Sequence, residues 1–158
     1  MKQLTIIVFV LALGIWILNV NSLQVQPSTP TPTPTTTPSP TTTPTPLTAL
    51  TLYSTYQQYR SQHDLPPIGY NPALCANYGD IRVKEIQTDW SHNGFWIHEG
   101  KTSYYEIGEN LARFYSTPEA VMNAWDNSPE HKRNLLDRGY YNVCFSIDGT
   151  YVVQTLSS

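Results

Sequence analysis

The sequence predicts an α+β domain with a small antiparallel sheet, and three observations lead to this fold class. Apolar residues recur at helical spacing after residue 48, two strand-like runs close the chain, and an Asp-Gly pair lies between those runs. Helices followed by a terminal hairpin are typical of α+β domains, since a hairpin pairs antiparallel strands. The 158 residues leave room for one compact domain, which we expect over residues 48–158 and as a monomer, together with additional segments.

Residues 1–22 form an apolar segment that we expect to direct export. Leu4 to Leu18 is apolar except for Thr5 and Gly14. This run is shorter than the roughly 20 residues needed for a helix that crosses a bilayer, and it fits the core of a secretory signal peptide. Val20-Asn21-Ser22 offers a cleavage point, and an uncleaved membrane anchor is the alternative. In either case the rest of the chain leaves the cytoplasm, and only this segment is expected to contact a membrane.

Residues 23–47 are expected to be a disordered linker. This range holds 8 of the 13 prolines of the chain, interspersed with Thr and Ser. Such a composition cannot form a core, because it lacks large apolar side chains and proline removes backbone donors. The segment is therefore predicted to be an extended stalk or a neutral spacer, and its hydroxyls are candidate glycosylation sites.

Two helices are predicted at the start of the domain. Leu50, Tyr53, Tyr56 and Tyr59 follow helical spacing, and Leu65-Pro66-Pro67 ends that helix. A second helix begins at Asn71-Pro72, which has the pattern of an N-cap and a first-turn proline. Its apolar stripe is Leu74, Cys75, Tyr78, Ile81 and Ile86.

The second half of the domain is predicted to hold a loop, two short helices and three strands. Residues 89–105 lack periodicity and are expected to be a long loop, and residues 106–114 a strand. Ser116 with Glu119 would form a capping box, and Ser128-Pro129 would begin a helix through Leu136. The closing strands are expected over 140–147 and 151–156, joined by Asp148-Gly149-Thr150.

Charge and cysteine content limit the functional classes. All 12 acidic residues lie after residue 63, against eight basic residues after residue 48. Nucleic acid is therefore not expected as a partner, since phosphate binding requires clustered Lys and Arg. The two cysteines exclude a four-cysteine zinc site. Export favours a disulfide between Cys75 and Cys144, and two buried free thiols are the alternative.

Three polar clusters lie at the edges of predicted elements, where binding sites usually occur. They are Trp90-Ser91-His92-Asn93-Gly94, Gly108-Glu109-Asn110-Leu111-Ala112, and Trp125-Asp126-Asn127-Ser128-Pro129-Glu130-His131. Together with Arg60, Leu65-Pro66-Pro67-Ile68 and Tyr151-Val152-Val153-Gln154, their order and spacing resemble the CAP superfamily. This is the family of cysteine-rich secretory proteins, antigen 5 and pathogenesis-related proteins. The resemblance is to its short bacterial secreted branch, and it covers nearly the whole domain.

The resemblance implies an α-β-α sandwich with an open groove. In many family members the floor of the groove holds two His and two acidic residues, which places His92, Glu109 and His131 in the groove here. The second acidic position looks occupied by Ser128, so a four-residue metal site does not follow. Some members bind zinc or another divalent metal through the two His, others bind lipids, and no general catalytic activity is established for the fold.

The residues themselves leave two interpretations of this trio open. Two neutral imidazoles can hold Zn²⁺ with water completing the tetrahedron, and Glu109 can orient one of them. Alternatively, His92, Glu109 and His131 hydrogen-bond one another and hold the loops on the sheet. Among other candidates, we expect His98-Glu99 in an exposed loop, Ser128 as a helix cap rather than a nucleophile, Trp125 in the core, and Trp90 and Trp96 in the groove.

Two functions of different class follow from the sequence. The first is a secreted or surface-tethered binding module whose groove takes an extracellular peptide, glycan or lipid and needs no cofactor. The second is a metal-assisted hydrolase that acts on cell-envelope material. The binding module is favoured, because a serine stands where a second carboxylate would be, and enzymatic activity stays an open question.

Overall fold

The structure is a computed structural model that describes residues 43–99 and 106–158. These residues belong to one compact unit. The predicted export segment and most of the predicted linker lie outside the described residues. None of the helices in the described ranges is long and apolar enough to span a bilayer.

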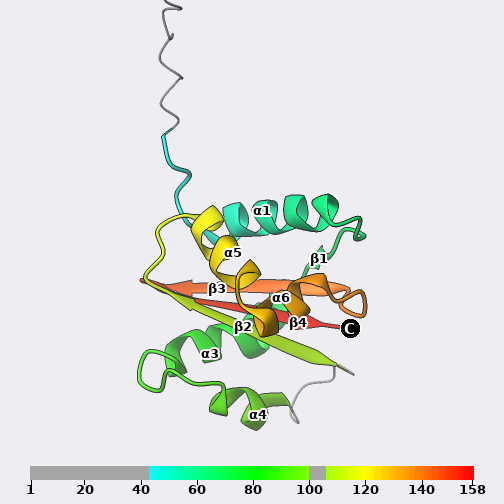
Figure 1. Ribbon diagram of the computed structural model, residues 1–158. Coiled ribbons are helices and arrows are strands. Elements are labelled where there is room, and N and C mark those ends of the chain that lie inside the picture. The colour runs from blue at the N-terminus through cyan, green and yellow to red at the C-terminus, as the bar shows by residue number, and fades with distance from the viewer. Residues whose placement is uncertain (1–42, 100–105) are drawn as a thin grey trace, which may run out of the picture. The chain divides into compact units, whose positions relative to one another are not determined.

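The domain is a sandwich of helices around one sheet, as predicted (Figure 1). Helices α1 (Ala49–Gln62), α5 (Pro118–Asp126) and α6 (Pro129–Leu136) cover one face. The other face is covered by α3 (Asp80–Glu85) and α4 (Asn93–Glu99). The chain enters α3 through α2 (Pro72–Leu74) and η1 (Cys75–Gly79), which is a single π-helical segment.

The sheet is mixed. Its strands are β1 (Gly69–Tyr70), β2 (Ile107–Arg113), β3 (Asn142–Asp148) and β4 (Tyr151–Ser157), in the order β1-β3-β4-β2. The predicted antiparallel pairing is confirmed for β3 with β4 and for β4 with β2, while the two-residue β1 adds a parallel edge to β3. The predicted hairpin turns at Gly149, whose φ of 58° favours glycine.

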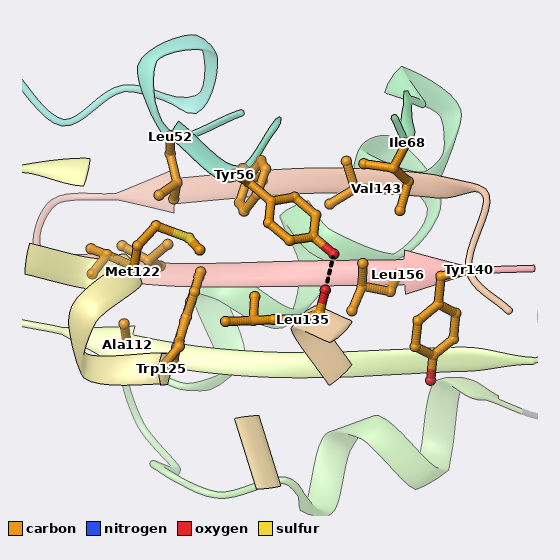
Figure 2. Packing of buried hydrophobic residues seen from close by; sticks show 13 residues of the cluster. Leu52, Tyr56, Ile68, Ala112, Met122, Trp125, Leu135, Tyr140, Val143 and Leu156 are labelled. Atoms are coloured by element: carbon orange, nitrogen blue, oxygen red, sulfur yellow. Dashed lines mark hydrogen bonds between the residues drawn. The ribbon is translucent and has the colours of Figure 1, made fainter. Parts of the chain in front are cut away.

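The main core lies between α1, α5, α6 and the sheet, as Figure 2 shows. Trp125 is buried there, as predicted, and its indole Nε1 donates to the Leu111 carbonyl (2.9 Å). The Tyr56 hydroxyl crosses the core to donate to the Leu135 carbonyl (3.0 Å). This bond ties α1 to the end of α6 and helps to satisfy a helix-terminal carbonyl that has no partner within the helix.

The predicted first helix is confirmed as α1, which turns Leu52, Tyr56 and Arg60 toward the sheet and leaves Leu50 75% exposed. One predicted helix cap is wrong. The N-cap of α5 is Thr117, whose hydroxyl accepts from the Ala120 amide (3.2 Å), and not Ser116. Proline is favoured at the first helical position, so Pro118 assigns the cap to the residue directly before it.

The predicted loop over residues 89–105 contains a helix. Helix α4 buries Phe95 against Tyr78 and Ile107, and this tertiary contact stabilises a segment that lacks helical periodicity of its own. His98 lies on this helix rather than in an exposed loop, with Nε2 2.8 Å from Glu85 Oε1. Residues 100–105 lie outside the described part of the chain.

The predicted disulfide is confirmed. Cys75 and Cys144 are bonded, and so η1 is tied to β3. The bond joins positions 69 residues apart. In the chain-entropy model, closing a loop of this size stabilises the fold by roughly 4 kcal/mol. The bond also indicates an oxidising compartment, because cytosolic thiols stay reduced.

Candidate functional site

A pocket of about 310 Å³ lies along the β2 edge of the sheet. It is bounded by α4 and the residue before it, by the first residues of β2, by α6, and by the segment before β3. Polar and aromatic side chains share its wall. The lining residues are His92, Phe95, Trp96, Ile107, Gly108, Glu109, Glu130, His131, Arg133, Asn134 and Tyr140.

Glu109 is a buried carboxylate with three hydrogen-bonding contacts. Arg82 donates to it twice, from Nε to Oε2 (2.7 Å) and from Nη2 to Oε1 (3.0 Å). His92 Nδ1 lies 2.9 Å from the same Oε1. A bidentate arginine fixes the plane of the carboxylate, and the carboxylate then fixes the histidine ring. His92 Nε2 is therefore the ring nitrogen left to meet a ligand.

Arg82 organises this side of the groove from beneath. It is 1% exposed, and Nη1 donates to Glu85 Oε2 (2.7 Å) while Nη2 donates to the Ser91 carbonyl (2.9 Å). Burial alone would lower the pKa of Arg82, but its hydrogen bonds to Glu109 and Glu85 raise that pKa. Gly94 lies directly over the guanidinium, where any added Cβ would overlap Arg82 and Glu85. The glycine thus allows α4 to approach the ion pair closely.

His131 is positioned by a polar network that fastens α6 to the sheet. Asn110 Nδ2 donates to the His131 carbonyl (3.2 Å) and to Gln154 Oε1 (2.8 Å). Asn134 Nδ2 donates to the Glu109 carbonyl (3.1 Å) and to Asn110 Oδ1 (2.9 Å). These amides pair with backbone groups of both β2 and α6, so the helix that carries His131 has one register on the strand that carries Glu109.

Tyr140 forms the wall next to the start of β2. Burial, followed by the charge of Glu106, raises the pKa of Tyr140 to about 12, so the phenol stays protonated at neutral pH. A Cβ on Gly108 would lie 2.6 Å from the Tyr140 hydroxyl oxygen. Only glycine therefore lets the phenol lie across this part of β2.

The structure brings His92 and His131 to the same groove. Their ring centroids are 6.4 Å apart. Two imidazoles on one Zn²⁺ would have centroids roughly 5 to 6 Å apart, given bonds of about 2 Å to the ring nitrogens. Burial and the neighbouring His92 lower the pKa of His131, which favours the neutral form that a metal requires. The two histidines thus fit a divalent ion after a small adjustment.

A complete ligand set is not preformed. No group of three or more His, Cys, Asp or Glu side chains in the described ranges is arranged to hold a metal ion. Glu109 is engaged by Arg82 and His92, so its position suits the support of a histidine ligand rather than direct coordination. Water or a bound ligand would have to supply the remaining donors.

Two sequence-predicted groove residues lie elsewhere. Ser128 is the N-cap of α6, makes no side-chain capping bond and does not line the pocket, and the charged Glu130 lies in the wall instead. Trp90 also lies outside the pocket, whereas Trp96 lines it. Residues 128–131 span about one helical turn, so small rotations of α6 decide which of them faces the groove.

Sequence reasoning missed Arg82, Arg133 and Tyr140. Arg82 carried a readable signal, since it continues the i, i+4 spacing of Leu74 and Tyr78 into the apolar face of its helix. A lone charge on such a face needs a buried partner. Arg133 lies on the predicted helix that carries His131, one turn after Glu130, so helical spacing gave a signal for it. For Tyr140 no local signal existed, because the packing of separate elements brings it to the groove.

Comparison with known proteins agrees with this architecture. The family model for the cysteine-rich secretory protein family, CAP, matches residues 53–151. The Bacillus subtilis protein YkwD is 42% identical over 41 residues, which cover 26% of this chain and 16% of that protein. The membrane protein YlbC of the same organism is 24% identical over 91 residues, covering 58% of this chain and 23% of YlbC. The chain thus matches less than a quarter of the length of either relative.

Solved structures share the fold. An extracellular protein containing an SCP domain from Bacillus anthracis aligns with a TM-score of 0.58 at 21% identity, over 69% of this chain and 39% of that one. An outer surface protein of Borrelia burgdorferi aligns with a TM-score of 0.58 at 22% identity, over 68% of this chain and 89% of that one. The family model covers most of the domain, including all three polar clusters, and so this chain belongs to the cysteine-rich secretory protein (CAP) family.

Proposed function

We propose that this chain is an exported or surface-tethered CAP-domain protein whose groove binds an extracellular ligand. This proposal rests mainly on the pocket of about 310 Å³, which is lined by aromatic rings together with charged and amide side chains. Such a mixture binds ligands by stacking and orients them by a few polar contacts. The disulfide, together with the extracellular and outer-surface relatives of the same fold, supports a location outside the cytoplasm.

A binding role is proposed ahead of hydrolysis because of what surrounds Glu109. A general base needs a free carboxylate oxygen, whereas both oxygens of Glu109 are engaged by Arg82 and one also contacts His92. Ser128, the other candidate for chemistry, lies outside the pocket. Arg133, Glu130 and Trp96 also line the pocket and offer two charges and an aromatic ring. A peptide, a glycan or a lipid headgroup could each bind such a wall.

Ligands that purify with the native protein test this role. We expect wild-type protein to retain a compound detectable by mass spectrometry, and Arg133→Ala to lose it, because Arg133 lines the pocket. Lys132→Ala is the matched control, since Lys132 lies on the same helix but pairs with Asp126 (2.9 Å). Equal recovery from both variants would contradict a ligand in this groove.

We further propose that His92 and His131 bind a divalent metal such as Zn²⁺ within the groove. The contact between His92 Nδ1 and Glu109 supports this, because metal-bound histidines usually donate their other N–H to a carboxylate. In calorimetric titration with Zn²⁺, His92→Ala and His131→Ala should each weaken binding at least about tenfold. His63→Ala is the control, because exposed His63 contacts the Tyr59 carbonyl on α1. Unchanged affinity in both groove variants would leave the histidines a structural role only.

A further inference from the structure

A second surface lies at the other end of β2 and is built from Trp90, Arg113, Phe114 and Tyr151. We call these four residues the aromatic patch. Arg113 and Tyr151 are cross-strand neighbours on β2 and β4. Trp90, from the segment between α3 and α4, and Phe114, directly after β2, each lie against this pair. The ring centroids of Trp90 and Phe114 are 6.2 and 6.1 Å from that of Tyr151.

Phe114 is placed at a cost to the fold. Its φ is 68°, in the left-handed region that bulky side chains rarely adopt, and its side chain is 69% exposed. Its amide donates to the Thr150 carbonyl (3.0 Å), a bond that any non-proline residue could make. A glycine or asparagine would satisfy this backbone without strain and without exposing an aromatic ring. The fold therefore does not account for the phenylalanine, and residues kept in strained positions often serve a ligand.

Arg113 stacks on the two exposed rings of Trp90 and Phe114. Its guanidinium carbon is 4.3 Å from the Trp90 ring centroid and 5.2 Å from that of Phe114. Within the described ranges it makes no ion pair and no side-chain hydrogen bond. Asp148, the cross-strand neighbour of Tyr151, accepts from Gln87 Nε2 (2.9 Å) rather than from Arg113. A stacked guanidinium in this state presents a planar set of donors to a carboxylate.

We propose that the aromatic patch binds an acidic polysaccharide, a glycan that carries uronic-acid carboxylates. The C–H faces of pyranose rings are flat and apolar and pack on Trp90 and Phe114, as apolar groups do on aromatic rings. Arg113 pairs with a uronic-acid carboxylate of the bound glycan. That carboxylate supplies the negative charge that the aromatic patch lacks. This site is separate from the groove: Trp90, Arg113, Phe114 and Tyr151 are all absent from the pocket wall.

The test is a calorimetric titration of the full chain with hexagalacturonate and with a hyaluronan hexasaccharide. We expect at least one of them to bind, and Phe114→Gly, Trp90→Ala and Arg113→Gln each to weaken that binding at least about tenfold. Tyr141→Ala and Lys84→Ala are matched controls, an exposed aromatic and an exposed cation outside both the patch and the pocket wall, and each should stay within about twofold of wild type.

Comparator ligands and a stability measurement decide the chemistry. Cellohexaose should bind more weakly because it lacks carboxylates, and hexaglutamate because it lacks pyranose faces. Phe114→Gly should melt at or above the wild-type temperature, since it removes the left-handed strain. The proposal is overturned if neither acidic glycan binds, or if cellohexaose or hexaglutamate binds equally well. It is also overturned if the patch variants keep the wild-type affinity, or if the melting temperature of Phe114→Gly falls by several degrees. These outcomes are independent of the groove, because no patch residue lines the pocket. The patch can therefore bind a glycan whether or not the groove binds a metal or a ligand.

Discussion

Two buried arginines, one on each side of the sheet, are compensated in different ways. Arg82 and Arg60 are both 1% exposed. Arg82 is paired with the carboxylates of Glu109 and Glu85. Arg60 has no carboxylate partner in the described ranges: Nε donates to the Pro66 carbonyl (2.9 Å), and Nη1 donates to the Tyr56 hydroxyl (3.1 Å) and to the Leu135 and Asp137 carbonyls (3.3 and 3.2 Å).

The difference follows from what each arginine connects. Arg60 meets carbonyls at the end of α6 and in the segment after α1, where helix termini leave acceptors without partners. It therefore closes chain ends, and Nη2 finds no hydrogen-bond partner among the described residues. Arg82 instead joins two carboxylates, and each of these contacts a histidine, His92 or His98. Arg82, which orients ionisable groups, is thus neutralised by carboxylates. Arg60, which ties backbone segments together, is stabilised only by neutral hydrogen-bond acceptors.

Removal of Arg82 is expected to have the largest effect. Arg82→Met leaves the Glu109 carboxylate buried without its cation, which costs about 3 to 5 kcal/mol in comparable pairs. Urea unfolding measures this loss. Lys84→Met, at an exposed position of the same helix, should change stability by less than about 0.5 kcal/mol. The double variant Arg82→Met/Glu109→Met should recover part of the loss, since no unpaired carboxylate remains at position 109.

Removal of Arg60 should cost less. Arg60→Met leaves neutral carbonyls without donors, a penalty of about 2 to 3 kcal/mol in total. The same urea experiment measures it, with Arg138→Met as control, because exposed Arg138 makes a single bond to the Asp64 carbonyl (3.1 Å). A greater loss for Arg60 than for Arg82 would contradict the distinction between a neutralised and a carbonyl-solvated arginine.

A smaller effect is expected at the groove wall. Gly108→Ala forces Tyr140 away from β2, and mild overpacking of this kind costs about 1 to 2 kcal/mol. Gly139→Ala is the matched control, since the added Cβ would meet only side-chain carboxylate oxygens, Asp137 Oδ1 at 3.1 Å and Glu106 Oε2 at 3.6 Å. Thermal melting compares the two variants, and equal melting temperatures would show that Tyr140 yields without cost.

The smallest effect is a pH dependence on the Arg82 side of the sheet. Burial opposes ionisation of Glu85, but its hydrogen bonds to His98 and Arg82 outweigh burial and lower its pKa from the usual 4.5. A carboxylate with a lowered pKa stabilises the fold fully above that usual value, and the contribution is lost as pH falls through the folded-state pKa.

Melting curves of wild type and Glu85→Gln at several pH values measure this contribution. The difference between the two proteins should shrink as pH falls below 4.5, because Glu85 then loses its charge in the folded state. Glu119→Gln, at an exposed position of α5, should show no such change. A difference that persists in strong acid would assign the effect to side-chain shape rather than to charge.

Local patterns explain how much of the fold could be predicted. Proline fixes φ and glycine alone adopts positive φ at little cost, whatever surrounds them, so Asn71-Pro72, Ser128-Pro129 and the Asp148-Gly149 turn mark real boundaries. Helix α4 could not be predicted, because the burial of Phe95 against distant segments stabilises it. The exposure of Ile81 could not be predicted either. Ile81 belongs to an apparent apolar stripe but is 40% exposed, because the π-helical η1 shifts the helical register before it.

The sequence by itself determined helix α1, the start of the second helix, the terminal hairpin and, once export was inferred, the Cys75–Cys144 pairing. Each of these follows from a residue's own conformational preference or its redox chemistry. The expectation of His92, Glu109 and His131 in one groove came from the family resemblance rather than from any local preference. Only the tertiary structure decided that Arg82 holds Glu109, that Tyr140 closes the groove, and that Trp90 joins Phe114 at the far end of β2. Those contacts join residues from separate elements, and their geometry depends on how the helices pack on the sheet, which no local pattern encodes.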